Sequence, residues 1–207
     1  MPDSCDPIAR MALQLARLPG IGQKSAQRLA YHIASLPQEQ VKELAAALWQ
    51  GRKALRFCAC CGNYTQEELC PICADEKRHN GQICVVRDAR DVAAMERMRD
   101  YHGLYHVLGG LISPMDGIGP QDIEIESLEE RVKSGEVKEV ILALSATMEG
   151  DTTNFYIFRR LAPYPDVKIT MLARGVSVGN EIEYTDELTL GRSILNRTLF
   201  SDTFHKS

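Results

Sequence analysis

Four cysteines with the spacing C-x2-C-x8-C-x2-C constrain this chain more than any other feature of its sequence. They are Cys58, Cys61, Cys70 and Cys73. Two cysteines with two residues between them can turn inward on one tight knuckle, and a second such pair completes a tetrahedral shell around a zinc ion. Because protein thiolates then fill every ligand position, no position is left for water or a substrate. The spacing therefore predicts one structural zinc ion.

The alternative use of the same cysteines is a pair of disulfides. The start of the chain has neither a basic segment nor an apolar run of the secretory kind, and no stretch is apolar enough to span a bilayer. We therefore expect a cytoplasmic location, no membrane association, and reduced thiols that bind zinc. Cys60, inside the first knuckle, is interpreted as a bystander, and Cys84, in an apolar run, as a small core residue.

The charge of the chain is unevenly distributed. The 207 residues carry a net charge of -4, and 44% of them are apolar, which is ordinary for a soluble globular protein. Residues 1–60 hold eight basic and four acidic side chains, whereas the rest hold 16 basic and 24 acidic ones. If the protein binds a polyanion, the N-terminal third is where we expect the contact.

Hydrophobic periodicity divides the chain into four parts. Residues 1–56 show a helical period that is broken at 18–20 and at 36–37, which predicts three helices. Residues 57–79 hold the cysteines, and this segment is too short to fold without its metal. Residues 80–175 are expected to form an α/β domain and residues 176–207 a C-terminal oligomerisation segment.

In the third part the period alternates between strand and helix. Short runs rich in Val, Ile and Leu at 83–87, 105–108, 139–144 and 168–173 predict strands, and the segments 91–101, 125–133 and 152–161 predict helices. Strands that alternate with helices indicate a largely parallel sheet covered on both faces. In the last part, Leu188 and Leu190 are interpreted as a strand or turn that leads into a short helix at 193–199.

The segment from Leu18 to Arg28 has the form h-P-G-h-G-x-[KR]-x-A of a helix-hairpin-helix element. Gly20 and Gly22 permit a sharp turn and a close approach of the backbone to a ligand. The second helix then starts near residue 23 with unpaired N–H groups, which favour a phosphate oxygen. Lys24 and Arg28, four residues apart, project from one face beside it. We predict that these four residues contact the DNA backbone independently of base sequence.

A plainer interpretation is that the turn only joins two helices, and that their apolar faces serve dimerisation. The excess of basic residues in this part of the chain favours the DNA contact. The two interpretations are compatible.

Several motifs together resemble one known family. Residues 58–78 fit C-x2-C-x3-[ST]-x4-C-x-I-C-x4-R throughout, and the helical hairpin, the run Tyr-His-Val-Leu-Gly-Gly at 105–110 and the loop at 113–120 occur in the same order as in that family. The chain thus resembles the RecR family of bacterial recombination mediators along essentially its whole length. The resemblance implies an α/β fold class with a helix-hairpin-helix region, a four-cysteine zinc finger, a Toprim domain and a short C-terminal tail.

Toprim enzymes hold Mg²⁺ with a glutamate after the first strand and a D-x-D pair after a later one. At these positions the chain has Arg87, Ser145 and Thr147, and Arg87 departs even from the glutamate that most sequences of the RecR family carry. Glu149 and Asp151 remain of the acidic cluster. Asp88 and Asp91 are possible substitutes, although Asp91 equally suits the start of a helix. We therefore expect no catalysis.

The expected function is that of a sequence-independent DNA-binding protein in recombinational repair. No G-x4-G-K-[ST] motif is present, so we expect no nucleotide to bind. The resemblance implies action with RecO and RecF proteins to help load RecA on gapped DNA, and assembly into a homodimer or a tetrameric ring. The alternatives are a Toprim-type metal-dependent nuclease or topoisomerase-like enzyme, and a scaffold for partner proteins only.

Overall fold

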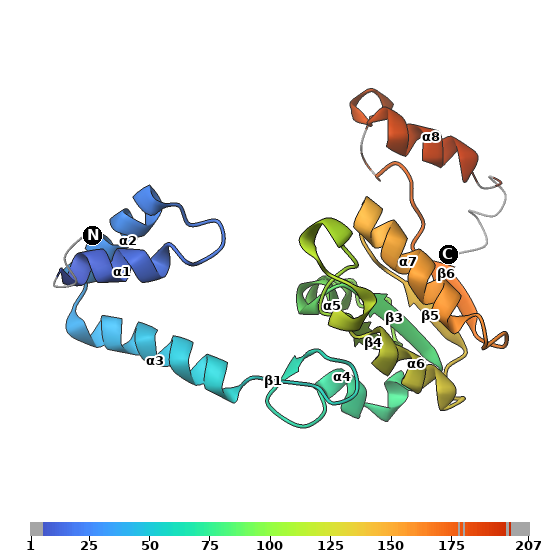
Figure 1. Ribbon diagram of the computed structural model, residues 1–207, viewed down its shortest axis with the longest axis horizontal. Coiled ribbons are helices and arrows are strands. Elements are labelled where there is room, and N and C mark those ends of the chain that lie inside the picture. Colours follow the sequence, from blue (N-terminus) through green and yellow to red (C-terminus); the bar gives the residue numbers. More distant parts are fainter. Residues whose placement is uncertain (1–5, 178, 180, 198, 200–207) are drawn as a thin grey trace. The chain divides into compact units, whose positions relative to one another are not determined.

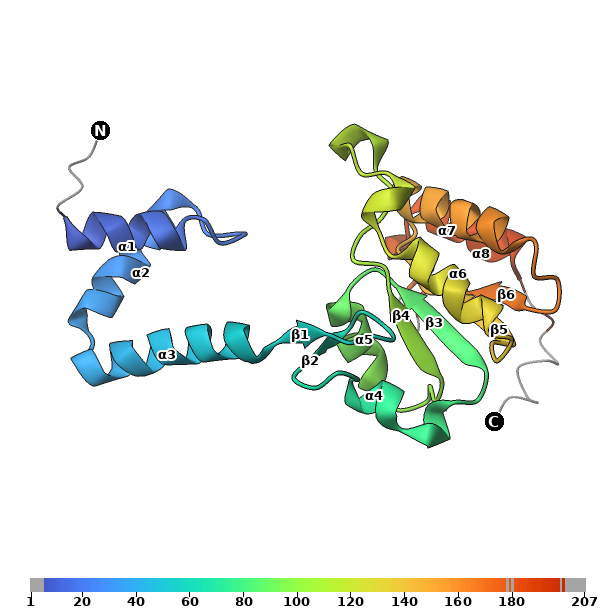
Figure 2. The ribbon, with the colours of Figure 1, turned by 60° about the horizontal axis from the view of Figure 1, so that its bottom comes forward.

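The computed structural model describes residues 6–177, 179, 181–197 and 199. The chain divides into two compact units, residues 1–55 and residues 56–207. Figure 1 labels helices and strands of both units where there is room, and Figure 2 also labels β2. Each unit has its own internal packing.

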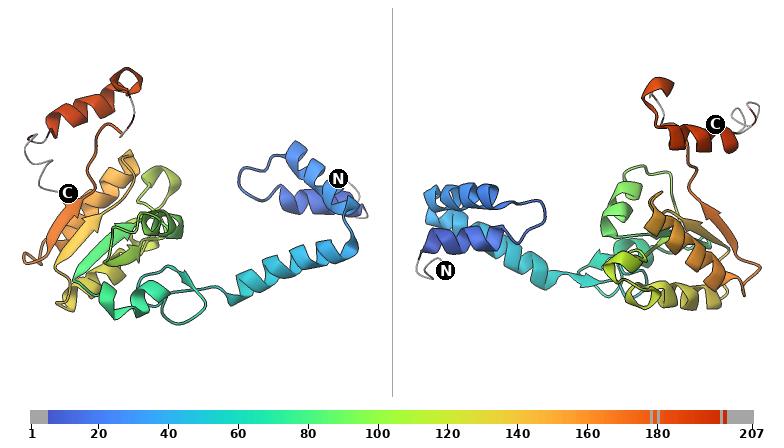
Figure 3. Two further views of the ribbon diagram at one scale, coloured as in Figure 1. Left: turned by 180° about the vertical axis from the view of Figure 1, so that it is seen from behind. Right: turned by 45° about the horizontal axis from the view of Figure 1, so that its top comes forward.

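The first unit consists of helices α1 (Pro7–Leu15), α2 (Gln23–Ser35) and α3 (Gln38–Ala54), which Figure 3 shows from two further sides. The prediction of three helices is confirmed. Asp6 caps α1 by accepting a hydrogen bond from the Ile8 amide (2.9 Å). At the break between α2 and α3, Leu36 has extended backbone geometry before Pro37, as the residue before a proline prefers.

The zinc finger begins the second unit. Strand β1 (Arg56–Phe57) pairs in antiparallel fashion with β2 (Tyr64–Thr65), and α4 (Pro71–Ala74) and the 3₁₀ turn η1 (Glu76–Arg78) follow. Gly62, between the strands, takes a left-handed φ of 73°, and a Cβ there would crowd the Val107 carbonyl oxygen. The Val107 amide donates to the Cys61 carbonyl (2.8 Å), so the finger covers an outer edge of the main sheet.

The main sheet has four parallel strands in the order β4-β3-β5-β6, as expected for this α/β segment. These are β3 (Gln82–Val86), β4 (Leu104–Val107), β5 (Glu139–Leu142) and β6 (Lys168–Met171). The register places Cys84 opposite Tyr105 on one side and Ile141 on the other. Cys84 is fully buried, as the sequence predicts.

Helices cover both faces of the sheet. Ile83 and Val85 point into a core shared with α6 (Ile125–Lys133) and α7 (Met148–Leu161). Cys84 and Val86 point into the opposite core with α5 (Ala89–Glu96). Figure 2 shows α5 on one face and α6 and α7 on the other. This arrangement follows from the two-residue period of a strand that is buried on both faces.

Two helix boundaries differ by four residues or more from the sequence-based expectation. Helix α5 ends at Glu96 and not at residue 101, and Arg99 shortly after it has a left-handed φ of 62° that is incompatible with a helix. Helix α7 begins at Met148 and not at residue 152, because Thr147 caps it by accepting from the Gly150 amide (3.2 Å). The 3₁₀ turns η2 (Pro114–Asp116) and η3 (Pro120–Asp122) lie in the loop between β4 and α6.

The expectation for the C-terminal segment is partly wrong. After the turn η4 (Ile182–Tyr184), Leu188 and Leu190 lie inside α8 (Glu187–Leu195) and not in a strand or turn. The cause is Asp186, whose side chain accepts from the Thr189 amide (2.9 Å) and starts the helix earlier. Residue 198 of the expected helix, and residues 200–207, lie outside the described residues. Over the part of the chain that the structure describes, no helix is both long and apolar enough to cross a membrane.

Candidate nucleic-acid interface and metal centre

The turn between α1 and α2 has the geometry that its glycines predict. The Ile21 amide donates to the Leu18 carbonyl (3.1 Å), and Gly20 takes a left-handed φ of 79° that other residues rarely adopt. Ala26 and Ala30 of α2 are fully buried, and their small side chains let α1 approach closely. The turn is therefore held by packing from both helices.

Gly22 is the N-cap residue of α2 and supplies no side chain to cap it. The first amides of α2 consequently have no side-chain partner at the cap, and they carry the positive end of the helix dipole. Lys24 and Arg28 are exposed one turn apart on this helix. Neither is in an ion pair with any acidic residue in the described part of the chain. Such a surface can accept a phosphate group without displacing an internal salt bridge.

The structure brings the four predicted zinc ligands together. The sulfur atoms of Cys58, Cys61, Cys70 and Cys73 all lie within 4.8 Å of one another, and the residues are buried. The Cys61 and Cys70 sulfurs are 3.6 Å apart. Sulfurs at 2.3 Å from a tetrahedral zinc are about 3.8 Å from each other, so the donor set fits this metal.

Backbone amides support the thiolates. The Cys70 amide donates to the Cys58 sulfur (3.2 Å) and the Cys73 amide to the Cys70 sulfur (3.4 Å). A hydrogen bond with the Cys73 thiol lowers the pKa of Cys61 to about 5. Hydrogen bonds with Cys60 first, and with Cys61 after it, raise the pKa of Cys73. The thiols thus compete for a few protons in a small space. A zinc ion replaces these protons and binds all four sulfurs as thiolates.

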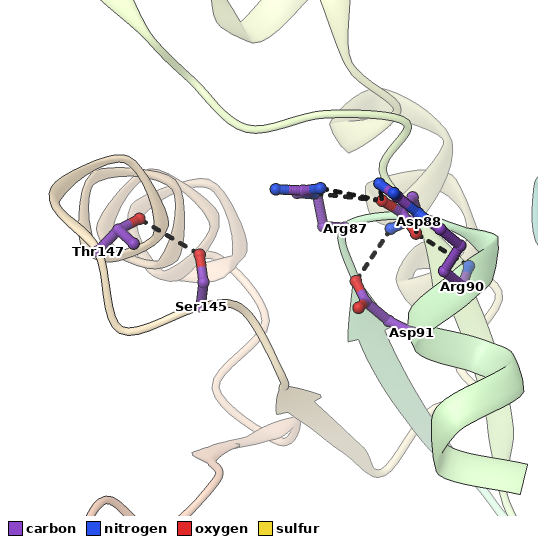
Figure 4. Close-up of polar contacts among 6 residues, drawn as sticks. All are labelled: Arg87, Asp88, Arg90, Asp91, Ser145 and Thr147. Carbon is purple, nitrogen blue, oxygen red and sulfur yellow. Dashed lines mark hydrogen bonds and ion pairs between the residues drawn. The ribbon is translucent and has the colours of Figure 1, made fainter. Parts of the chain in front are cut away.

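At the sheet edge where a Toprim enzyme has metal-binding acids, this chain has arginine–aspartate ion pairs and two hydroxyl side chains (Figure 4). Arg87, at the end of β3, forms an ion pair with Asp88 (3.2 Å). Asp88 also binds Arg90 (2.6 Å), and Arg90 first and Arg87 after it hold the pKa of the Asp88 carboxyl well below its usual range. Asp88 and Asp91 form a capping box at the start of α5. These two carboxylates stabilise a helix and do not face each other as metal ligands.

The two hydroxyl residues that stand in place of the aspartates contact each other. The Ser145 and Thr147 oxygens are 3.2 Å apart, and Thr147 also caps α7. A Cβ at Gly150 would collide with the Ser145 carbonyl oxygen, so the tight start of α7 requires glycine. Neutral hydroxyls that are used in this way give a divalent cation no charge compensation.

The remaining acids of this edge are dispersed. Asp151 is bound by Arg174 and lies 3.7 Å from a nitrogen of Arg192, and the hydrogen bond from Arg174 lowers the pKa of Asp151. Within the described residues, the four cysteines are the only group of three or more metal-ligating side chains that converge. The arginine partners of Asp88 and Asp151 were missed from the sequence. The pairing of Asp151 with Arg174 depends on the fold, and that of Asp88 with Arg87 and Arg90 on the turn at the start of α5.

A polar network that joins the zinc finger to the α/β domain was also missed. Arg78 donates to Glu96 (2.7 Å) and to the Gly103 carbonyl (3.0 Å), and the Tyr105 hydroxyl donates to the same Glu96 (2.7 Å). Arg78 is the last residue of the cysteine motif, so its fixed spacing from the ligands is the available signal. The network ties the finger to α5 and β4.

Together, these features define a Toprim-containing nucleic-acid-binding protein with a structural zinc finger. Family models match the chain in four consecutive segments: RecR helix-hairpin-helix at residues 8–51, the RecR four-cysteine zinc finger domain at 55–75, the Toprim domain at 81–173 and RecR C-terminal at 175–198.

Proteins named Recombination protein RecR are similar along the chain. The protein of Phocaeicola vulgatus is 56% identical over 92% of both chains, and that of Porphyromonas gingivalis W83 is 55% identical over 92% of this chain and 91% of its own. The protein of Staphylococcus aureus JH9 is 50% identical over 93% and 97%. The chain belongs to the RecR family. Its four-cysteine segment is the zinc finger of that family, and the structure gathers the cysteines to bind one metal ion.

Proposed function

We propose that this protein binds DNA without regard to base sequence and acts as a mediator of recombinational repair, without catalytic turnover. The observation that carries the proposal is the α1–α2 hairpin, where Gly20 and Gly22 form the turn and exposed Lys24 and Arg28 lie beside the uncapped start of α2. Backbone amides and cations at a helix start recognise phosphate and carry no information about bases. The relatives' printed name, Recombination protein, supports the biological role.

The arrangement of the Toprim edge supports a role without turnover. Metal-assisted phosphodiester cleavage needs several converging carboxylates. Arg87, Ser145 and Thr147 stand at three of those positions, and the neighbouring acids Asp88 and Asp151 are held by arginines. On this proposal the domain serves as a scaffold and a partner surface.

The exposed apolar surface of the first unit supports the proposal of self-association. Neither α1 nor α3 buries any residue within this chain. Large apolar side chains of the unit are exposed, among them Leu13, Leu44, Leu48 and Trp49. A second copy that covers them would recover about 25 cal/mol per Å² of apolar area. This supports a homodimer through the N-terminal unit, and a ring if the C-terminal segment supplies a second interface.

The finer parts of the proposal rest on membership of the RecR family. We infer a cytoplasmic protein that acts with RecO and RecF to help load RecA on gapped DNA. A ring lined by several copies of the hairpin would add many weak phosphate contacts, so DNA affinity would fall steeply with salt. The zinc finger would hold its place against the α/β domain through Arg78 and Glu96.

The test is a charge reversal at the hairpin. Lys24→Glu with Arg28→Glu is expected to abolish binding of a fluorescent single-stranded or duplex oligonucleotide, while zinc content and circular dichroism stay unchanged. The matched control, Lys77→Glu with Lys138→Glu, makes the same change in net charge on exposed lysines of the second unit. Equal losses in both variants, or unchanged affinity of the hairpin variant at low salt, would remove the hairpin from the proposed function.

A further inference from the structure

A groove of about 730 Å³ lies within the second unit, between the zinc finger and the α/β domain. Phe57 and Tyr64 of the zinc finger line it, and so do Asp122 and Glu124 from the loop before α6. Val107, at the end of β4, also lines it. The α1–α2 hairpin contributes nothing to this groove, and of the four zinc ligands Cys58 alone lines it. Figure 2 labels β1, β2, α5 and α6, the elements that flank it.

Two aromatic rings of this groove are exposed as a fixed pair. Phe57 is 66% exposed and Tyr64 is 55% exposed, although they are neighbours across the β1–β2 ladder. Their rings stack with centroids 5.3 Å apart. Each ring thus has a defined position before any ligand arrives, so binding on them costs little side-chain entropy. Exposed aromatic side chains of this kind are enriched where proteins bind one another.

The charged groups of the groove carry an excess of negative charge. Its acidic residues are Asp88, Asp122 and Glu124, and its only strongly basic one is Arg90, which is bound to Asp88 (2.6 Å). Asp122 accepts hydrogen bonds from the Gly119 amide and from Gln121, and Glu124 accepts one from Ser127. Across the described residues neither Asp122 nor Glu124 has a cationic partner. The groove therefore offers two carboxylates to an incoming cation.

We propose that this groove is a docking site for a segment of a partner protein that presents an arginine or lysine beside an apolar side chain. The cation pairs with Asp122 and Glu124 and lies over the ring of Phe57 or Tyr64, which attracts cations through its electron-rich face. The apolar neighbour covers the remaining exposed ring surface. The site goes beyond the proposed DNA binding and lies in the other unit from Lys24 and Arg28, so either proposal can fail alone.

Charge separates this occupant from nucleic acid. Aromatic rings also stack on unpaired bases, but sites of that kind place the rings in a positively charged channel. Here, the two carboxylates of the groove that have no cationic partner among the described residues, Asp122 and Glu124, would repel the phosphates. The negative charge of the groove would repel a strand of DNA, whereas it attracts a basic protein segment.

The experiment uses a random dodecapeptide library displayed on phage. It is selected on the full zinc-loaded chain and counter-selected on the Phe57→Ala, Tyr64→Ala double variant. The recovered peptides are expected to be enriched in arginine or lysine next to apolar residues. The most frequent peptide, synthesised with a fluorescent label, is expected to bind the aromatic variant and the Asp122→Asn, Glu124→Gln variant at least about tenfold more weakly, as loss of an aromatic anchor or a charge pair implies. Met98→Ala, which removes another exposed apolar side chain, serves as the matched control.

Several results would overturn the proposal. One is a recovered pool without basic enrichment, or with no peptide that distinguishes the variants. Another is a poly-dT oligonucleotide that loses affinity for the aromatic variant and gains affinity for the carboxylate variant, which would make the groove a DNA platform. A third is a fall in the solution mass of the aromatic variant, which would show that the groove is an interface between copies of the chain. If the aromatic variant loses zinc, the carboxylate variant decides alone.

Discussion

At the scale of single residues, the protein uses arginines where a Toprim enzyme has a metal. Arg87, Arg90 and Arg174 each pair with a carboxylate of the edge that would otherwise attract a divalent cation. The sequence alone identifies Arg87, Ser145 and Thr147 as departures from a cutting enzyme. It could not identify the partner of Asp151, because Arg174 lies in a separate segment of the chain. The partners of Asp88 are neighbours in the sequence, but their pairing depends on the turn that Asp88 caps at the start of α5.

A direct consequence concerns strand scission. Zinc-loaded protein incubated with supercoiled plasmid and Mg²⁺ is expected to leave the plasmid uncut, and Glu149→Gln is expected to behave identically. The readout is agarose electrophoresis of the plasmid over several hours. Nicking by the natural chain that disappears in the Glu149→Gln variant would establish the enzymatic alternative.

His106 gives the fold a dependence on pH. It is buried, its Nε2 lies 2.6 Å from the Glu124 carbonyl oxygen, and Arg131 contacts its Nδ1 (3.3 Å). Burial lowers the pKa of His106 to about 4, with a smaller contribution from the Arg131 cation. The unfolded chain takes up this proton near the ordinary histidine pKa of about 6.5. Between these two values the unfolded state therefore binds more protons, and the free energy of unfolding falls as the pH falls.

We expect urea denaturation to show this contribution as up to about 3 kcal/mol of stability that is present above pH 6.5 and lost progressively toward pH 4. His106→Gln removes the titrating group. The difference in free energy of unfolding between the natural chain and this variant is therefore expected to shrink across that range. A difference that is independent of pH would show that His106 is protonated in the folded state as readily as in the unfolded one.

At the scale of elements, helix starts are set by local chemistry that the sequence only partly reveals. Short polar side chains cap α5, α7 and α8: Asp88, Thr147 and Asp186. The apolar period placed the bodies of α6 and α7 correctly, but it missed the true start of α8 because two leucines there suggested a strand. The early end of α5 accompanies the left-handed backbone conformation of Arg99, which no sequence pattern predicted.

Gly150 tests the tight start of α7. Gly150→Ala is expected to lower the free energy of unfolding by about 1–3 kcal/mol, because the new methyl group meets the Ser145 carbonyl oxygen, part of the rigid backbone. Gly191→Ala in α8 is the matched control, since open space surrounds that position and alanine favours a helix by about 1 kcal/mol. Equal effects of both substitutions would mean that α7 shifts to accommodate the methyl group.

The zinc finger is the element most dependent on its ligand. Only two short strands, the one-turn helix α4 and turns surround the four cysteines, so the metal supplies most of the ordering. Removal of zinc with a strong chelator is expected to release one ion per chain and to open residues 57–75 to proteolysis, while the main sheet keeps its circular dichroism signal. Protease resistance of this segment in the metal-free protein would contradict a structural role for the ion.

At the scale of the whole molecule, a protein with the proposed mediator role is expected to work as an assembly. The sequence predicted the parallel sheet, the zinc ligands and the helical hairpin, since these depend on period, spacing and glycine. It could not predict the groove between the zinc finger and the α/β domain, because the lining residues come from separate parts of the chain. Both the sequence and the structure show the exposed apolar side chains of α3, Leu44 and Leu48 among them.

Assembly through the first unit can be measured directly. Leu44→Gln with Leu48→Gln is expected to reduce the solution mass, by light scattering, toward that of a single chain of 23.1 kDa. Glu43→Gln with Gln50→Glu changes another face of the same helix and preserves net charge, so it should keep the mass of the natural protein. An apolar-face variant with unchanged mass would show that other surfaces hold the assembly.

The dependence of DNA affinity on salt tests the central claim most directly. The logarithm of the association constant is measured against the logarithm of the salt concentration for the natural chain and for Lys24→Ala with Arg28→Ala, on two unrelated DNA sequences. We expect equal weakening on both sequences and a slope shallower by about two per hairpin that contacts the DNA, one for each lost phosphate contact. An unchanged slope, or a loss confined to one of the two sequences, would contradict phosphate recognition by the hairpin.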